Sequence, residues 1–256
     1  MRKPFLLFIL QVWVLLPVSA ETGAQIMQRV MDNQNPASSA MDMEMTLIDS
    51  RGDTGTRRIQ TLILNDGGLT KTVTVFLEPA SVRNTRFLSV ENPDRGDDQW
   101  IYLPALQKVR RIASGEKEGS FMGSDFSYED MSTREIDEST HTRLRPETLN
   151  GRACQVVESV PLPGTESAYG KMISWVDDQT SLTLRVEFYG KDGTGPVKIL
   201  TREGFRQVGS RWTAERTVME TVATGHRTVM DLKQVKFDIP ISAAYFSTGF
   251  LQTGRP

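Results

Sequence analysis

Polar and apolar residues alternate along most of this chain, which is the pattern of strands that bury one face. In residues 38–48 the apolar positions fall at every second residue, namely Met41, Met43, Met45 and Leu47. Further runs of this kind follow as far as residue 237 and are separated by turn sequences such as Asn-Gly at residues 150–151. The pattern predicts about eleven strands.

Helices are few in this pattern. Residues 21–33 place apolar side chains at helical spacing, and Thr22 can cap the first turn. Residues 239–250 predict a short helix or a docked turn that caps the sheet. Strands that follow one another without intervening helices favour an antiparallel barrel or a strongly curved sheet over a parallel α/β fold. The expected fold is therefore mainly β, with a single domain over residues 21–256.

The first twenty residues predict a cleavable secretory signal peptide. Two basic residues precede an apolar run over residues 5–16, which is shorter than the ~20 residues needed to span a bilayer. Small side chains at Val18 and Ala20 fit a peptidase site, so the mature chain is expected to begin near Glu21. No cysteine follows that site, and we expect a soluble exported protein without a lipid anchor there.

Composition excludes further classes. The 30 Lys and Arg residues against 32 Asp and Glu residues give a net charge of −2, which argues against a nucleic-acid scaffold. Cys154 is the only cysteine, so no internal disulfide can form, and a buried inert thiol is expected.

The sequence offers no catalytic or metal-binding motif. Neither His141 nor His226 has a carboxylate or a second histidine at ligand spacing. Ser120 lies one place too early for the nucleophile of a hydrolase elbow, and no glycine-rich phosphate loop is found. The acidic residues at positions 94, 97 and 98 lack the spacing of a calcium loop and indicate a solvated turn. We therefore expect no enzyme, no cofactor and no bound metal.

Residues 99–131 interrupt the alternation. Trp100 and Tyr102 share one side of a short strand that ends at Pro104. The next extended run carries three basic side chains, which are Lys108, Arg110 and Arg111. Residues 119–131, GSFMGSDFSYEDM, mix glycines with the apolar side chains Phe121, Met122, Phe126 and Tyr128. We interpret residues 119–131 as a mobile apolar flap.

At these residues the sequence resembles a known family. The run WIYLPALQKVRRI, followed by SFMGSDFSYEDM, is similar to the outer-membrane lipoprotein-sorting proteins of the LolA-like superfamily, in particular the longer periplasmic branch often found with RND-type exporters. The resemblance is strong over residues 97–131 and architectural elsewhere. It implies an incomplete antiparallel β-barrel wrapped over a few short helices, an apolar cavity for acyl chains, a periplasmic location in a Gram-negative-type envelope, and no catalysis.

We therefore expect a pocket for lipid or lipoprotein acyl chains. The predicted walls are Met41, Met43, Met45, Leu62, Val73, Val75, Trp100 and Tyr102, and the predicted cover is Phe121, Met122, Phe126 and Tyr128, hinged at Gly119 and Gly123. Flexible methionines suit variable apolar ligands, although ordinary core packing is the alternative explanation for three of them on one strand face. On this hypothesis Trp100→Asp abolishes lipid uptake.

The function expected from these features is a monomeric carrier that moves acyl chains between membranes. An inner-membrane RND-type exporter and an outer-membrane acceptor are the expected partners. Lys108, Arg110 and Arg111 would bind such a partner or lipid head groups, with a solvated strand face as the alternative. A periplasmic sensor or adaptor that regulates a membrane partner is the alternative function, and an enzyme acting on lipid or cell-wall material is the third.

Overall fold

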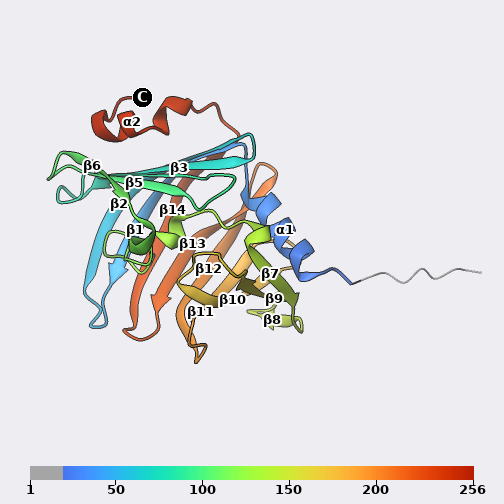
Figure 1. Ribbon diagram of the computed structural model, residues 1–256. Helices are drawn as coiled ribbons and strands as arrows, with labels where there is room; N and C mark the ends of the chain where they lie inside the picture. The colour runs from blue at the N-terminus through green and yellow to red at the C-terminus, as the bar shows by residue number, and fades with distance from the viewer. Residues whose placement is uncertain (1–19) are drawn as a thin grey trace, which may run out of the picture.

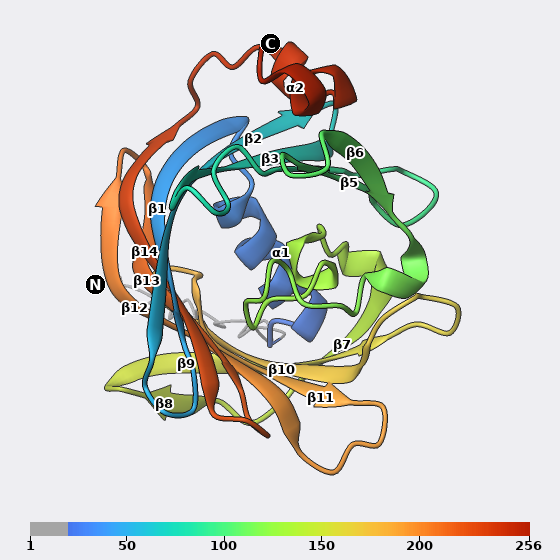
Figure 2. The same ribbon diagram turned by 90° about the vertical axis from the view of Figure 1, so that its left-hand side faces the viewer.

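The computed structural model describes residues 20–256, and nearly all of the predicted signal peptide lies outside these residues. Fourteen strands form one antiparallel sheet that curves through most of a barrel (Figures 1 and 2). The spatial order is β6-β5-β4-β3-β2-β1-β14-β13-β12-β11-β10-β9-β7, with β8 paired to β9. The two end strands, β6 and β7, do not pair with each other, which confirms the predicted incomplete barrel.

The strands follow the alternating runs of the sequence. Their bounds in the first half are β1 Ser38–Ile48, β2 Thr54–Asp66, β3 Leu69–Glu78, β4 Arg86–Val90, β5 Asp98–Leu103, β6 Lys108–Ile112 and β7 Ser139–Arg143. In the second half they are β8 Glu147–Leu149, β9 Arg152–Pro161, β10 Tyr169–Asp177, β11 Thr183–Gly190, β12 Pro196–Val208, β13 Arg211–Thr221 and β14 His226–Phe237.

The prediction of about eleven strands was too low. Residues 141–148 contain the end of one strand, β7, and the start of another, β8. Pro146 lies between the two strands, and its missing N–H group interrupts the ladder. The second edge of the sheet is therefore shorter and more broken than the pattern predicted.

The opening helix, α1 (Gly23–Gln34), lies inside the curve of the sheet (Figure 2). Thr22 caps it as expected, and Gln25 completes a capping box by bonding back to the Thr22 N–H group. Gly23 has to be a glycine, because a Cβ atom there would lie 2.4 Å from the His141 carbonyl oxygen of β7. The helix buries Ile26 and Val30 against strands β9 and β10.

The last residues cover the outer face of the sheet, which confirms that this segment docks as a cap. A turn of 3₁₀-helix (Ala243–Tyr245) and the short helix α2 (Thr248–Thr253) lie outside the curve, over strands β3 to β6 (Figures 1 and 2). Phe246, Phe250 and Leu251 pack there against Val73 and Leu88. No helix within residues 20–256 has the length and apolarity to span a membrane.

Candidate functional site

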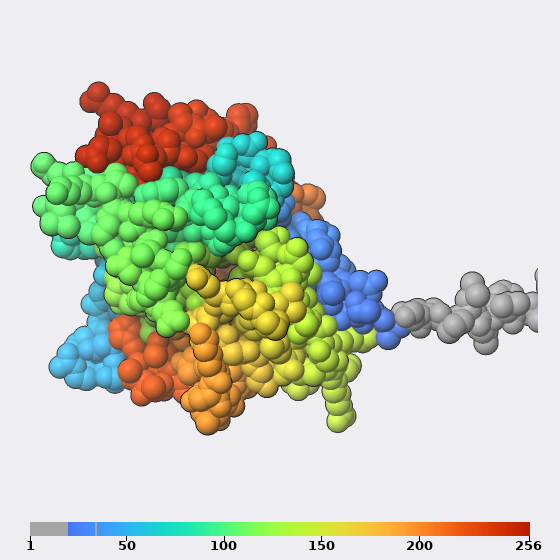
Figure 3. All heavy atoms as spheres, in the orientation of Figure 1, coloured from blue at the N-terminus to red at the C-terminus, as the bar shows by residue number. Residues whose placement is uncertain are grey.

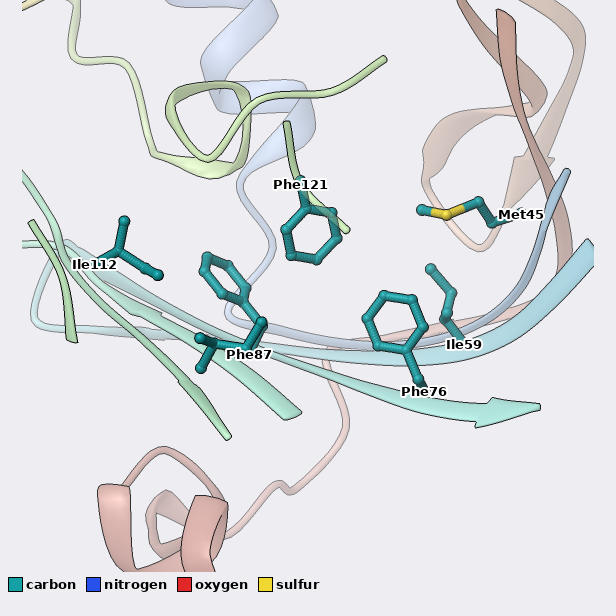
Figure 4. Close-up of a cluster of buried hydrophobic side chains, with 7 residues drawn as sticks. Met45, Ile59, Phe76, Phe87, Ile112 and Phe121 are labelled. Atoms are coloured by element: carbon teal, nitrogen blue, oxygen red, sulfur yellow. The ribbon is translucent and has the colours of Figure 1, made fainter. Parts of the chain in front are cut away.

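The concave face of the sheet carries the largest apolar cluster. Met45, Ile59, Phe76, Phe87, Ile101 and Ile112 lie side by side on strands β1 to β6 and are at most 2 % exposed (Figure 4). They belong to the inward phase of the alternation, because residues directly opposite each other on paired strands share a face. The inner surface is therefore apolar from the β6 edge of the sheet to its centre at β1.

The flap, residues 119–131, enters this concavity and fills part of it. The Phe121 ring is fully buried, and its centroid lies 5.1 Å from that of Phe87, 5.6 Å from Tyr128 and 5.9 Å from Phe76. These separations are those of attractive aromatic pairs. At the tip, Met122 and Gly123 both have positive φ angles, of 55° and 75°. The tight turn drives Phe121 toward the sheet like a plug (Figure 4).

Three hydrogen bonds hold the flap to the sheet through its main chain, and in one of them the Asp125 N–H group donates to Thr228 Oγ1 of β14 at 2.9 Å. The Nη1 atom of Arg57, on β2, donates to the Met122 carbonyl oxygen at 2.6 Å, and Gln99 Nε2, on β5, donates to the Tyr128 carbonyl oxygen at 2.8 Å. No carboxylate of the described residues pairs with Arg57. Burial lowers the pKa of Arg57, and Met122 supplies an acceptor for this partly desolvated cation.

A carboxylate in the middle of the flap bonds to strands β13 and β14. Asp125 accepts from Thr221 at 2.6 Å, from Thr228 at 2.7 Å, and lies 2.8 Å from His226 Nδ1. His226 had been excluded as a metal ligand by its sequence context, and its role here is to hold Asp125. The flap is thus linked to strands β13 and β14 as well as to β2 and β5.

A second carboxylate fixes the end of the flap. Asp130 is 2 % exposed and accepts from Lys198 at 2.9 Å, from Arg134 at 3.1 Å and from the Tyr169 hydroxyl at 3.0 Å. Burial by itself would raise the pKa of Asp130, but the charges of Arg134 and Lys198 hold it below its ordinary value. The same environment raises the pKa of Tyr169 through burial and the Asp130 charge.

The predicted pocket walls divide between the two faces of the sheet. Met43 and Met45 belong to the concave cluster. Met41 shares their face, because the ladder pairs Met41 with Thr61, Thr61 with Thr74, and Thr74 with Phe87 of the same cluster. The remaining walls pack under the C-terminal cap on the convex face: Leu62, Val73, Val75, Trp100 and Tyr102. The prediction that these eight residues line one pocket is therefore wrong.

The cause is that both faces of strands β2 to β5 are apolar. Alternation separated the two sets of side chains correctly, but it does not say which set faces the inside of the curve. The sequence-based interpretation chose the Leu62 and Val73 set, which α2 covers, over the Ile59 and Phe76 set. Phe121, Met122, Phe126 and Tyr128 all pack on the concave cluster, and their role as a cover for a ligand stays a prediction.

The basic residues of β6 already have internal partners in two of three cases. Arg110 pairs with Glu116 at 2.6 Å, and Arg111 pairs with Asp98. Arg95 and Arg111 hold the pKa of Asp98 far below its ordinary value. Lys108 is exposed and makes no ion pair with the described residues. Partner binding by these three side chains stays a prediction.

The centre of the concave face contains a row of residues that the sequence analysis did not single out. Strand register places Arg202, Thr217, Met230, Met45 and Arg57 directly opposite one another across β12, β13, β14, β1 and β2. Met43 and Met230 are only partly buried. A signal for Arg57 was present in the alternation, which puts it in phase with Ile59, whereas Arg202 needed the ladder to place it.

Two shallow depressions open at the surface, and neither is the predicted pocket. One, of about 530 Å³, is lined mainly by polar residues around Asp42, Arg58 and Lys233. The other, of about 310 Å³, lies at the flap tip beside Gly123 and His226. A narrow hollow is visible where the lime-green and yellow parts of the chain meet (Figure 3). The flap occupies the part of the concavity that lies over the cluster on strands β1 to β6.

Comparison with known proteins supplies relatives for this architecture. The chain is 33% identical to a structure from Vibrio parahaemolyticus described as an outer membrane lipoprotein-sorting protein domain, with a TM-score of 0.84 over 90% of this chain and 98% of that one. A DUF1329 family protein from Desulfovibrio piger is 30% identical, with a TM-score of 0.86 and the same coverage.

More distant matches concern the fold. A LolA superfamily protein from Nitrosomonas europaea shares 19% identity and a TM-score of 0.71, over 90% of this chain and all of that one. A family model described only as "Uncharacterized protein" matches residues 68–253. None of the curated proteins matches the chain.

Proposed function

The chain belongs to the family of the outer membrane lipoprotein-sorting domain and DUF1329 proteins, and from this premise we propose that it is a periplasmic carrier that shelters the acyl chains of lipids or lipoproteins in its concavity. The observation that carries the proposal is the apolar concave face, which is covered by a loop segment of the chain and not by a continuous second layer of structure.

The flap is suited to such a role because it imitates a ligand. Phe121 occupies the aromatic part of the concave face without being part of the sheet, and Phe126 extends the contact to a second cluster around Phe188 and Leu200. An acyl chain that displaced these rings would bury its methylene groups in their place, at about 0.8 kcal/mol each. Exchange between flap and hydrocarbon keeps the apolar face covered in both states.

The methionine side chains support variable cargo. Met41, Met43 and Met45 lie on the same face of β1, and Met45 lies directly opposite Met230 on β14. Unbranched thioether side chains adapt to ligands of different shape. Ordinary core packing would leave these residues fully buried, yet Met41, Met43 and Met230 are only partly so. The wall is therefore available to a ligand at the centre of the sheet.

Transfer between membranes is the wider part of the proposal. The carrier would receive acyl chains at the inner membrane, from an exporter of RND type, and deliver them to an outer-membrane acceptor. The basis for these partners is the resemblance of residues 97–131. The chemistry needed is binding and release, to which the flap contacts contribute directly, and no catalytic step enters the proposal.

Mass spectrometry of organic extracts tests the carrier directly. Protein purified from its native compartment is expected to contain hydrocarbon lipid in a stoichiometric amount, and the same protein refolded from denaturant is expected to contain none. Refolded protein should then bind the neutral fluorescent probe N-phenyl-1-naphthylamine, with displacement by dodecanol. Absence of lipid from the native protein together with absence of probe binding would refute the proposal.

A further inference from the structure

Arg202 is a cation on the concave face, and none of the carboxylates in residues 20–256 forms an ion pair with it. Its strand neighbours place it on the concave face, because Leu200, two residues earlier, packs with Tyr169 and Phe188 in the inner cluster. Its cross-strand neighbour Thr217 lies opposite Met230, which packs on Met45. Arg202 therefore lies two strands from Met230 on the concave face, and its hydrogen bond to the Thr183 carbonyl oxygen directs the guanidinium group toward β11.

The hydrogen bonds of Arg202 leave most of the group unused. Nη1 donates to the Thr183 carbonyl oxygen at 3.0 Å, and no carboxylate of the described residues lies within ion-pair distance of the side chain. The nearest acidic residue on the same face of β13, Glu215, pairs instead with Arg206 at 3.2 Å. A guanidinium group has five N–H donors, so Arg202 retains donors for a ligand.

The energetic position of Arg202 is unusual for a side chain of this type. Arg202 is partly buried, and desolvation lowers its pKa to about 10, so the side chain stays charged at neutral pH but loses part of its hydration. Buried charges in proteins are normally paired, because an unpaired one is costly. A ligand that brought a negative charge to this position would relieve that cost and would gain charge-assisted hydrogen bonds.

Arg202 and Arg57 occupy the two ends of the central row. Four strand spacings separate them, about 19 Å measured along the curved sheet. Arg57 is engaged by the flap through the Met122 carbonyl oxygen, whereas Arg202 has no contact of this kind. The two cations are therefore not equivalent while the flap is closed, and Arg202 is the one available to a ligand.

We propose that Arg202 binds the anionic head group of the cargo, so that the carrier selects amphiphiles that combine a hydrocarbon chain with a phosphate or carboxylate group. The proposal rests on the carrier function proposed above and names its class of ligand. The chain of the amphiphile lies along Met230, Met45 and Met43, and its head group meets the guanidinium one strand beyond Thr217. Selectivity comes from charge at one end of an otherwise apolar surface.

Displacement of N-phenyl-1-naphthylamine from the purified protein at pH 7 measures this selectivity. Three competitors share a twelve-carbon chain and differ in charge: dodecyl phosphate, dodecanol and dodecyltrimethylammonium. We expect dodecyl phosphate to displace the probe at a concentration at least about tenfold lower than dodecanol, and the cationic compound to be the weakest. Equal potency of the first two would overturn the selectivity while leaving the carrier function intact.

Variants of Arg202 test whether this side chain causes the preference for dodecyl phosphate. Arg202→Gln is expected to make dodecyl phosphate and dodecanol equally potent without changing the dodecanol value more than about twofold. The matched control is Arg216→Gln, which removes an arginine from the outward phase of the adjacent strand, where it pairs with Asp231 at 2.7 Å. The control should keep the preference for phosphate, as should Arg202→Lys in part.

Each remaining outcome also decides the question. A preference that persists in Arg202→Gln places the head group elsewhere and refutes the role of Arg202. If Arg202→Gln does not fold, the ranking of the three competitors on the wild-type protein and on Arg202→Lys still tests the inference.

Inorganic phosphate, titrated by calorimetry, should bind far more weakly than dodecyl phosphate. Equal binding would mean a site for free anions and would refute the amphiphile. Failure of the probe and of dodecanol to bind at all would instead refute the carrier function.

Discussion

Arg57 and Met122 lie 65 residues apart in the chain, and the hydrogen bond between the Arg57 guanidinium and the Met122 carbonyl oxygen joins strand β2 to the tip of the flap. The acceptor belongs to the main chain, so the contact depends on the position of the flap and not on the side chain at residue 122. Arg57 also lies 6.0 Å from the centre of the Phe76 ring, which orients its guanidinium group within the apolar face.

Arg57→Met should loosen the flap while leaving the sheet intact. Hydrogen bonds that involve a charged group contribute about 1.5–3 kcal/mol, so amide hydrogen exchange in residues 119–128 should accelerate about tenfold or more. Arg58→Met is the matched control, because Arg58 is exposed on the opposite face of the same strand. Unchanged exchange in the flap, or equal acceleration in both variants, would show that Arg57 does not hold it.

Phe121→Ala should remove the plug and improve ligand entry. Loss of a fully buried aromatic side chain lowers the free energy of unfolding by about 3 kcal/mol or more, and here it also vacates space on the concave face. N-phenyl-1-naphthylamine should therefore bind more tightly to the variant, in spite of its lower stability as measured by urea unfolding.

The control for Phe121 is Phe250→Ala. Phe250 is also buried, but it belongs to the C-terminal cap and packs on the convex face. This variant should lose stability without any gain in probe binding. A gain of similar size in both variants would mean that general loosening, and not the vacated space, admits the probe.

Met43→Asp should block uptake, whereas Trp100→Asp should not. Met43 belongs to the concave wall, and a carboxylate there would have to be desolvated by every acyl chain that binds. Trp100 lies under the cap, so its replacement should instead lower thermal stability by weakening the docking of α2. This reverses the expectation from sequence for Trp100, and the two variants compared by probe titration decide between the faces.

Stability should depend on pH through Glu135, which follows the flap. Burial and the neighbouring Glu91 carboxylate raise the pKa of Glu135 to about 7 from 4.5. The folded state then holds the proton more tightly than the unfolded state, so this contribution to stability is complete below pH 4.5 and is lost as the pH rises to about 7. Glu91 is 7 % exposed and accepts from the Thr70 N–H group at 2.7 Å, so it cannot simply turn away.

Glu135→Gln should remove this dependence. The variant should melt at a higher temperature than the wild-type protein above pH 7 and at a similar temperature near pH 4.5, as followed by circular dichroism. Glu166→Gln, which alters an exposed glutamate, provides the control and should keep the wild-type profile. If the melting temperature of the wild-type protein rose between pH 4.5 and 7, and Glu135→Gln abolished that rise, the assignment would be wrong.

Local sequence determined the elements of this protein. Alternation of side chains along a strand is a property of the backbone, so residues 38–48 and 86–90 could be assigned as β1 and β4 with their bounds correct. The Thr22 cap of α1 was accessible for the same reason, since it depends on neighbours in the chain. The residues of the flap were identified because glycines interrupt an otherwise regular pattern there.

Tertiary structure decided which face of the sheet is concave. Two apolar faces with the same periodicity, one bearing Phe76 and the other Val73, are equivalent in sequence until the direction of curvature and the position of α2 distinguish them. The row from Arg57 to Arg202 likewise exists only through pairing between five strands whose order the sequence does not state. Non-local pairing brings these two cations to one surface, because strand register depends on the assembled sheet and not on any single strand.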